Sequence, residues 1–195
     1  MTGPRFLHRV GFLAVAAVLV LPAPAVAGSQ TLSPSAEGNN CVNKLAPIVE
    51  GSPEVRIASS SCFDTFAAAI SFATGGATRL SVHAQPSSLR QKLLPKISGA
   101  TLAATDVVIG VDWELPSKGG ASVVWETPTG CDFSHWYLLG NVGSNWNDRI
   151  QSAKGFSGCV RYRHFEHEEY QGLVRTCTPY CQAMPSWTTS LQWDN

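Results

Sequence analysis

The sequence predicts a mainly β protein, an antiparallel sandwich preceded by a small N-terminal β-hairpin plus helix extension. Two observations lead to this fold class. The chain is rich in turn-forming residues, with 17 Gly and 12 Pro among 195 residues. From Val107 onward, short aromatic and β-branched runs alternate with Gly, Pro, Asn and Ser, which is the pattern of short strands joined by turns.

The composition excludes several classes of protein. Hydrophobic residues make up 44% of the chain and charged residues 14%, below the ~25% usual for globular domains, so the chain is too apolar to be disordered. Lys plus Arg (14) balance Asp plus Glu (14), for a formal net charge of zero. Without a basic surface the chain is not expected to bind nucleic acid.

Residues 1–27 are expected to be a secretory signal peptide. Arg5 and Arg9 form a basic start, residues 10–21 are apolar, and Ala25-Val26-Ala27 matches the small-x-small pattern that precedes cleavage. A membrane span needs about 20 apolar residues, so this run is too short for one. We therefore expect a secreted (extracellular) product that begins at Gly28 and has no membrane attachment. In such a compartment, six cysteines indicate three disulfides.

The segment that follows predicts a compact hairpin. Residues 28–40 are small and polar and are expected to be a flexible lead-in. In the unit 41–83, apolar runs at 42–49 and 55–58 flank a turn at 50–53, which predicts two short strands. Cys41 and Cys62 bracket this hairpin, so we expect them to form a disulfide.

A short helix is predicted after the hairpin. Ser61-Cys62-Phe63-Asp64 resembles a capping box, and apolar residues follow at helical spacing on one face: Phe63, Phe66, Ala67 and Ile70. Gly75-Gly76 would end this helix. Residues 84–106 mix Pro, Ser, Gly and Lys without clear periodicity, and we interpret them as a connector with one short helical stretch.

An internal repeat organises the remainder, residues 107–195. An aromatic-Glu pair followed by a glycine occurs at Trp113 with Gly120 and again, 52 residues later, at Phe165 with Gly172. An aromatic and a glycine seven residues apart suit a folded β-hairpin, because glycine permits a turn with positive φ and the aromatic ring covers the fold-over. Each copy is followed by a segment that ends in a serine, and that serine could tie the unit to its hairpin: Ser152 in the first and Ser190 in the second.

This pair of signals resembles the βγ-crystallin Greek-key motif, in which an aromatic-x6-Gly hairpin precedes an Asn/Asp-Asn/Asp-x-x-Ser/Thr-Ser stretch. The resemblance implies a two-Greek-key, βγ-crystallin-like sandwich, with keys at about 107–156 and 160–193 and an insertion at about 127–140. It also implies disulfides between Cys131 and Cys159, joining the insertion to the second key, and between Cys177 and Cys181. Six cysteines allow 15 connectivities, so this pairing is a prediction.

In microbial members of this family the Asn/Asp-rich stretch supplies oxygen ligands to Ca²⁺, which requires hard oxygen donors. The resemblance places the candidate ligands at five positions: Asn147, Asp148, the backbone carbonyl of Arg149, Gln151 where the family normally has a Ser/Thr ligand, and Glu166 at the hairpin position of the other key. No cofactor is expected to be required, and Ca²⁺ is the one candidate. The alternative is that Asn147-Asp148 forms a turn capped by its own side chains, as Asn and Asp often do.

No enzymatic site is expected. The cluster His164-Phe165-Glu166-His167-Glu168-Glu169 contains residue types that bind metals, but zinc proteases need two histidines at i and i+4 on a helix. In a strand these side chains would point alternately to opposite faces. With every cysteine assigned to a disulfide, no thiol nucleophile remains. A polar hairpin around Phe165 explains the cluster without catalysis.

Two functions follow from the resemblance. The family contains a secreted actinobacterial metalloproteinase inhibitor with a disulfide-closed loop in its second key, and Cys177-Thr178-Pro179-Tyr180-Cys181 is similar to that loop. A loop held by a disulfide binds a protease cleft with little ordering cost. The first function is therefore inhibition of an extracellular (metallo)proteinase by a monomer. The alternative is a calcium-stabilised extracellular structural, stress or toxin-like binding module.

Overall fold

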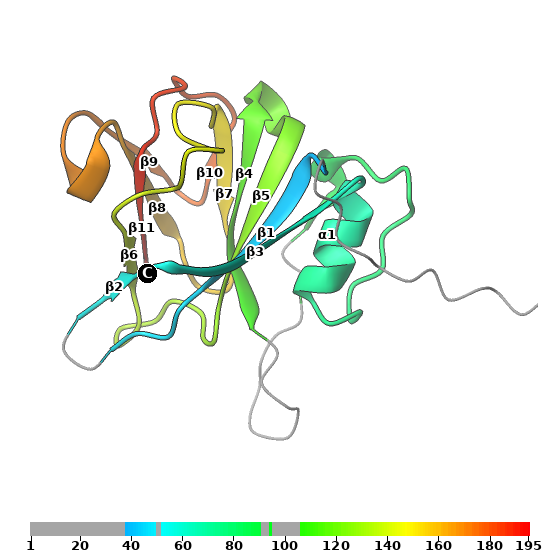
Figure 1. Cartoon of the computed structure of the whole chain (residues 1–195), viewed down its shortest axis with the longest axis horizontal. Coiled ribbons are helices and arrows are strands. Elements are labelled where there is room, and N and C mark those ends of the chain that lie inside the picture. The colour runs from blue at the N-terminus through cyan, green and yellow to red at the C-terminus, as the bar shows by residue number, and fades with distance from the viewer. Residues whose placement is uncertain (1–37, 50–51, 91–93, 95–105) are drawn as a thin grey trace, which may run out of the picture. The chain divides into compact units, whose positions relative to one another are not determined.

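The computed structural model describes residues 38–49, 52–90, 94 and 106–195. The predicted signal peptide, most of the lead-in and most of the connector therefore lie outside the described residues. In the described part, the chain forms two β-sheets and one α-helix (Figure 1). The six-stranded sheet has the order β10 (Tyr180–Cys181), β7 (Ser152–Gly155), β4 (Val107–Leu115), β5 (Gly119–Thr127), β1 (Asn40–Leu45), β3 (Ile57–Phe63). The five-stranded sheet has the order β2 (Glu54–Val55), β6 (Tyr137–Leu139), β11 (Ser190–Asp194), β8 (Arg161–Phe165), β9 (Val174–Cys177).

The two Greek keys exchange one strand each. In the first key, β4, β5 and β7 lie in the six-stranded sheet, whereas β6 crosses to the other sheet and pairs with β11. In the second key, β8, β9 and β11 lie in the five-stranded sheet, whereas β10 crosses back and pairs with β7. This reciprocal exchange confirms the predicted βγ-crystallin-like sandwich.

The N-terminal extension adds strands to both sheets. β1 pairs in parallel with β5 and antiparallel with β3, and β2 pairs in parallel with β6. The extension thus covers an edge strand of each sheet, which would otherwise present unpaired backbone groups. The described residues also contain three short 3₁₀ turns: η1 (Pro86–Ser88), η3 (Pro116–Lys118) and η4 (Glu168–Tyr170).

The helix begins later than the sequence predicts. α1 spans Phe66–Ala73, and Thr65 is its N-cap, accepting a hydrogen bond from the amide of Ala68 at 3.2 Å. The predicted capping box at Ser61 is wrong, because residues 61–63 continue β3 and Cys62 pairs with Cys41 across the sheet. The predicted end is close, since Thr74 caps the helix and Gly75 follows it with a positive φ of 56°.

The six-stranded sheet is covered by apolar side chains on both faces. Between the sheets, the ring of Trp193 packs 5.8 Å from that of Trp125 and 5.0 Å from that of Tyr162. On the outer face, α1 packs against β1, β3 and β5, and its Phe66 and Ile70 belong to the same buried apolar cluster as Val111 of β4. In the inter-sheet layer, a Cβ atom at Gly110 would lie 2.5 Å from Trp193 Nε1, so this position of β4 accepts no side chain.

All three predicted disulfides are confirmed. Cys41–Cys62 joins β1 to β3, Cys131–Cys159 joins the insertion to the start of the second key, and Cys177–Cys181 joins β9 to β10. No free cysteine remains among the described residues. The last bridge is therefore also a link between the two sheets, because β9 and β10 belong to different ones.

Candidate functional site

The two folded hairpins have closely matching geometry. Each contains two consecutive non-glycine residues with positive φ (Ser117 and Lys118 in the first, Glu169 and Tyr170 in the second), followed by a glycine with φ 73° at Gly120 and 78° at Gly172. The carboxylate of Glu114 accepts a hydrogen bond from the amide of Ala121, and Glu166 accepts one from Leu173. The positive φ explains the repeated glycine, since a Cβ atom disfavours this region.

A buried serine ties each hairpin to the rest of its key. Ser152 Oγ donates to the Leu115 carbonyl at 2.7 Å and accepts from the Lys118 amide at 3.0 Å. Ser190 Oγ donates to the His167 carbonyl at 2.7 Å and accepts from the Tyr170 amide at 3.0 Å. Each serine hydroxyl therefore satisfies one backbone carbonyl and one backbone amide of its folded hairpin.

The centre of the sandwich contains a polar network that the sequence analysis missed. His164 Nε2 lies 3.1 Å from Asp112 Oδ1, and both side chains are fully buried. Trp125 Nε1 donates to Asp112 Oδ2 at 2.8 Å, and the Tyr162 hydroxyl donates to the same oxygen. Burial, with the Asp112 charge adding to it, raises the pKa of Tyr162 well above its usual value, so the hydroxyl keeps its proton as a donor.

This network separates the predicted polar cluster into two environments. His164 belongs to the buried network, whereas His167 and Glu166 lie near the surface, with His167 Nε2 3.9 Å from Glu166 Oε2. Phe165 is only half-buried, and its ring forms a T-shaped pair with the ring of Tyr170, with the centroids 5.7 Å apart. Asp112 and His164 lie 52 residues apart, the same offset as the repeat, which is the signal that could have revealed them.

An oxygen-rich pocket lies where the two keys meet. It measures about 620 Å³ and brings Asn147 and Asp148 of the first key next to Glu166 and Thr189 of the second. The side-chain carbonyl of Asn147 (Oδ1) is buried there without a hydrogen-bond partner. Asp148 has a positive φ of 58°, and its amide donates to the Thr188 carbonyl, which fixes the turn against the second key.

The five predicted calcium ligands do not all reach this pocket. Asn147, Asp148 and Glu166 line it, together with Glu168, Gln171 and Thr189, which the prediction did not include. Arg149, whose backbone carbonyl is the predicted ligand, is not among the residues that line the pocket, and its side chain pairs with Glu114 of the first hairpin, Nη2 lying 2.7 Å from Oε1. The backbone amide of Gln151 donates a hydrogen bond to the Trp113 carbonyl, and Gln151 is not among the residues that line the pocket. Among the residues that the structure describes, no three His, Cys, Asp or Glu side chains gather as a metal-binding group.

The Cys177–Cys181 loop consists of two different halves. Its downstream half belongs to the six-stranded sheet, because Tyr180 and Cys181 pair with β7 and the Pro179 carbonyl accepts from the Gly155 amide. Its upstream half continues β9, the outermost strand of the five-stranded sheet. Leu173, which precedes β9, and residues 174–176 of the strand are exposed, with Leu173 63% and Val174 53% accessible.

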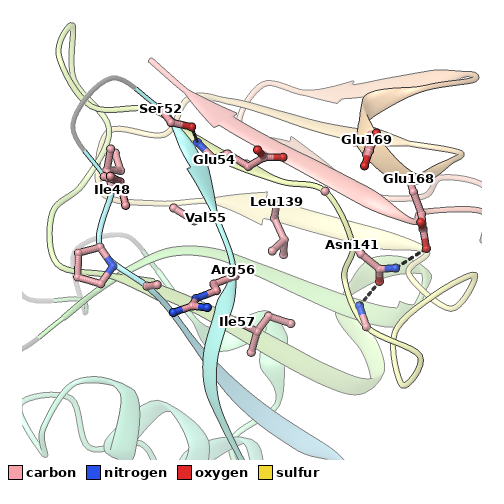
Figure 2. Close-up of a pocket in the computed structure, with 15 residues that line it drawn as sticks. Ile48, Ser52, Glu54, Val55, Arg56, Ile57, Leu139, Asn141, Glu168 and Glu169 are labelled. Carbon is pink, nitrogen blue, oxygen red and sulfur yellow. Dashed lines mark hydrogen bonds between the residues drawn. The ribbon is translucent and has the colours of Figure 1, made fainter.

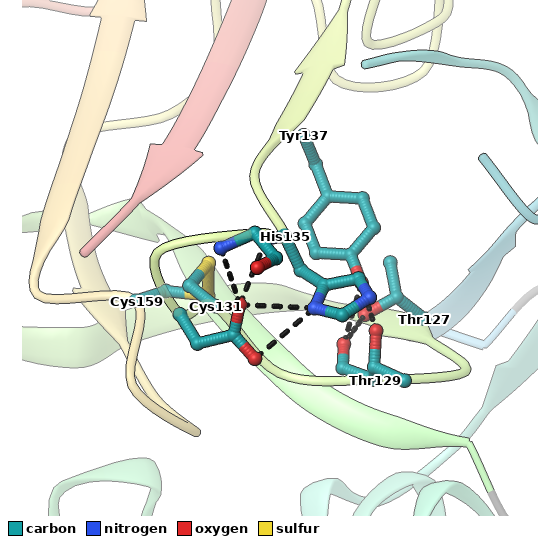
Figure 3. Close-up of polar contacts among 8 residues, drawn as sticks. Thr127, Thr129, Cys131, His135, Tyr137 and Cys159 are labelled. Carbon is teal, nitrogen blue, oxygen red and sulfur yellow. Dashed lines mark hydrogen bonds and ion pairs between the residues drawn. A yellow bond between two sulfur atoms is a disulfide. The ribbon is translucent and has the colours of Figure 1, made fainter. Parts of the chain in front are cut away.

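The insertion after β5 is a fixed loop (Figure 3). The Asp132 carboxylate accepts from the Ser134 and His135 amides at 2.7 and 2.8 Å and contacts His135 Nδ1 at 2.9 Å. These interactions lower the pKa of Asp132, and the hydrogen bond from the Ser134 amide contributes most. At its base, the loop is held by the Cys131–Cys159 bridge and by the Tyr137 hydroxyl, which donates to the Thr129 carbonyl at 2.8 Å.

The strand exchange, the paired hairpins and their serine ties define a protein of the βγ-crystallin-like fold. No family model and no curated protein matches the chain. Among solved structures, the chain is similar to a βγ-crystallin from an archaeon, with 18% sequence identity and a TM-score of 0.33. The alignment covers 44% of this chain and 96% of the archaeal one. Within the described residues, no helix is long and apolar enough to cross a membrane.

Proposed function

We propose that this chain is a secreted, non-enzymatic βγ-crystallin-like protein that inhibits extracellular metalloproteinases through the segment leading into its C-terminal disulfide loop. The observation that carries this proposal is the edge strand β9, whose exposed residues run directly into the Cys177–Cys181 bridge. Residues 173–178 are named the edge segment below. An edge strand offers backbone groups that can pair with an extended groove in another protein.

The disulfide would reduce the cost of binding. Both sulfurs are buried, and the downstream half of the loop is paired with β7, so the edge segment is held at one end before any partner arrives. Along its length, every residue of β9 is paired with β8, which keeps this part of the edge segment extended. A segment ordered in advance loses less conformational entropy on binding than a free peptide does, and it resists cleavage.

Inhibition can be tested with purified protein and a thermolysin-like metalloproteinase. We expect inhibition in the nanomolar to micromolar range, weakened by reduction of the disulfides. Val174→Glu places a charge on the edge segment and should weaken inhibition at least tenfold. The matched control is Val82→Glu, because Val82 and Val174 are both 53% exposed and Val82 lies outside the edge segment. Full proteinase activity with rapid digestion of the protein would refute the proposal.

A second candidate function, calcium binding, is supported by the buried and unpartnered Asn147 Oδ1 in the oxygen-rich pocket. A buried amide oxygen without a partner costs free energy, and a cation would remove that cost. Side-chain oxygens of Asn147, Asp148, Glu166 and Thr189 fit the preference of Ca²⁺ for hard donors. Bound Ca²⁺ would neutralise the carboxylates and join the two keys.

Calcium binding is testable by thermal unfolding in Ca²⁺ and in chelator. A ligand that binds only the folded state at 100 times its Kd stabilises it by about 2.7 kcal/mol. We therefore expect Ca²⁺ to raise the Tm by several degrees and Asp148→Asn to remove most of that rise. Asp64→Asn, which changes an exposed carboxylate outside the pocket, should leave it intact. No calorimetric heat at millimolar Ca²⁺ would exclude the site.

A further inference from the structure

A second, larger pocket lies where the N-terminal extension meets the sandwich (Figure 2). It measures about 1060 Å³ and is lined by β2 and the start of β3 on one side. The chain after β6 and the second hairpin line the other side. It is distinct from the oxygen-rich pocket and from the edge segment, with only Glu168 shared with the former.

The floor of this pocket is apolar and firmly held. Val55 is 7% exposed and Leu139 is 2% exposed. The two residues are neighbours in the sheet, because the parallel strands β2 and β6 pair them in register. Ile48 and Ile57 are partly buried and pack against the same inter-sheet core. Figure 2 shows Val55, Leu139 and Ile57 close together in the middle of the pocket. A floor of this kind favours a ligand with an aliphatic body.

The rim of the pocket is acidic. Glu54, Glu168 and Glu169 contribute three carboxylates, against the one guanidinium of Arg56, for a formal charge of −2. The carboxylates of Glu54 and Glu168 accept hydrogen bonds from neutral groups, the Tyr170 hydroxyl and the Asn141 amide. In the part of the chain that the structure describes, none of the three carboxylates forms an ion pair. The rim therefore offers negative charge that no side chain of the described part neutralises.

We propose that this pocket binds a small organic ammonium ion with an aliphatic body. The carboxylates favour a cation and repel a carboxylate ligand, and the apolar floor adds affinity for a hydrocarbon chain. The volume is that of a site for a small molecule of drug-like size. The extension thus has a role beyond covering sheet edges, because it supplies one wall and part of the charge.

The charge and the apolar body can be tested separately with three probes. Hexylammonium carries both features, hexanoate carries the same body with the opposite charge, and methylammonium carries the charge without the body. Amide NMR shifts of the purified protein would locate and titrate each. We expect hexylammonium to shift the amides of Val55, Leu139 and Gly140 with a Kd on the order of a millimolar, since the gain from burying its short hydrocarbon chain is largely offset by the cost of association. Hexanoate and methylammonium should bind at least tenfold more weakly.

Variants of the rim provide the decisive comparison. Glu54→Gln combined with Glu169→Gln should weaken hexylammonium binding about fivefold or more, whereas Asp64→Asn outside the pocket should leave it unchanged. Neither rim residue lines the oxygen-rich pocket or belongs to the edge segment, so failure here is separable from failure of the proposed functions. Equal binding of hexanoate, equal binding by the rim variant, or shifts that map elsewhere would overturn the proposal.

Discussion

Glu126 allows a sharp test of the energetics of this fold. It lies on β5, is 1% exposed, and stands opposite Lys44 of β1 in the sheet register. Lys44 is engaged by Asp106, its Nζ lying 2.8 Å from Oδ2. Burial raises the pKa of Glu126 from 4.5 to about 8, and the charge of Lys44 offsets only part of that rise. The folded state therefore prefers this carboxyl protonated, and Glu126→Gln mimics that state.

The sign and size of the pH effect follow from this shift. Because the folded-state pKa exceeds the unfolded one, the contribution of Glu126 to stability is fully present below about pH 4.5 and is lost as the pH rises to about 8. At 1.36 kcal/mol per pKa unit the whole window corresponds to about 5 kcal/mol, and the interval from pH 5 to 7 to about 2–3 kcal/mol. At neutral pH, folding must therefore protonate this carboxyl, and that proton uptake lowers the stability of the sandwich.

Urea unfolding at pH 5, 6, 7 and 8, with the disulfides intact, measures this effect. The free energy of unfolding of Glu126→Gln should fall less steeply with pH than that of the unsubstituted protein. Between pH 5 and 7 the two falls should differ by about 2–3 kcal/mol. Glu169→Gln, which alters an exposed carboxylate, should keep the original slope. Parallel curves for Glu126→Gln and the unsubstituted protein would refute the argument that burial dominates this site.

Three further substitutions test the packing and the capping groups by the midpoint of urea unfolding. Gly110→Ala should destabilise the fold by about 1–3 kcal/mol or more, because its Cβ atom would lie 2.5 Å from Trp193 Nε1, and an unchanged midpoint would contradict this close approach. Ser152→Ala should cost about 1–3 kcal/mol, because it leaves the Lys118 amide without its partner; a neutral effect would show that water replaces the hydroxyl. Thr65→Ala should cost about 1 kcal/mol by removing the helix cap, whereas no loss would mean that the cap is dispensable.

The repeat made much of the sandwich predictable. Trp113 with Gly120 and Phe165 with Gly172 mark the same fold-over, because positive φ restricts the choice of residue at the glycine. The disulfides followed from the resemblance and from the cysteines that bracket the first hairpin. The hairpin glycines and the bracketing cysteines lie within short segments, so the sequence pattern alone predicts them.

Other features depend on contacts that the local sequence does not encode. The parallel pairing of β1 with β5 joins segments about 80 residues apart, and no turn signal connects them. Residues 61–63 read as the start of a helix but stay extended, because the sheet and the Cys41–Cys62 bridge hold them. At residues 61–63 tertiary pairing overrides the local preference, and for β1 and β5 it joins two strands whose partners the local sequence does not specify.

The oxygen-rich pocket shows the same limit at a candidate site. The resemblance groups Asn147, Asp148, Arg149 and Gln151 of the first key with Glu166 of the second, because the family motif does so. The turn at Asp148 directs the first two toward the second key, whereas Arg149 pairs with Glu114 in the first hairpin. The motif does not mark the other second-key residues that line the pocket, Glu168, Gln171 and Thr189, and these are grouped only by the folded structure.

Inhibition of a thermolysin-like metalloproteinase is the most direct measurement of the proposed function. With increasing amounts of the purified protein, the proteinase should lose activity in the nanomolar to micromolar range. Val174→Glu should shift that curve at least tenfold, and Val82→Glu should leave it in place. A proteinase that keeps full activity while it cleaves the edge segment would contradict the account.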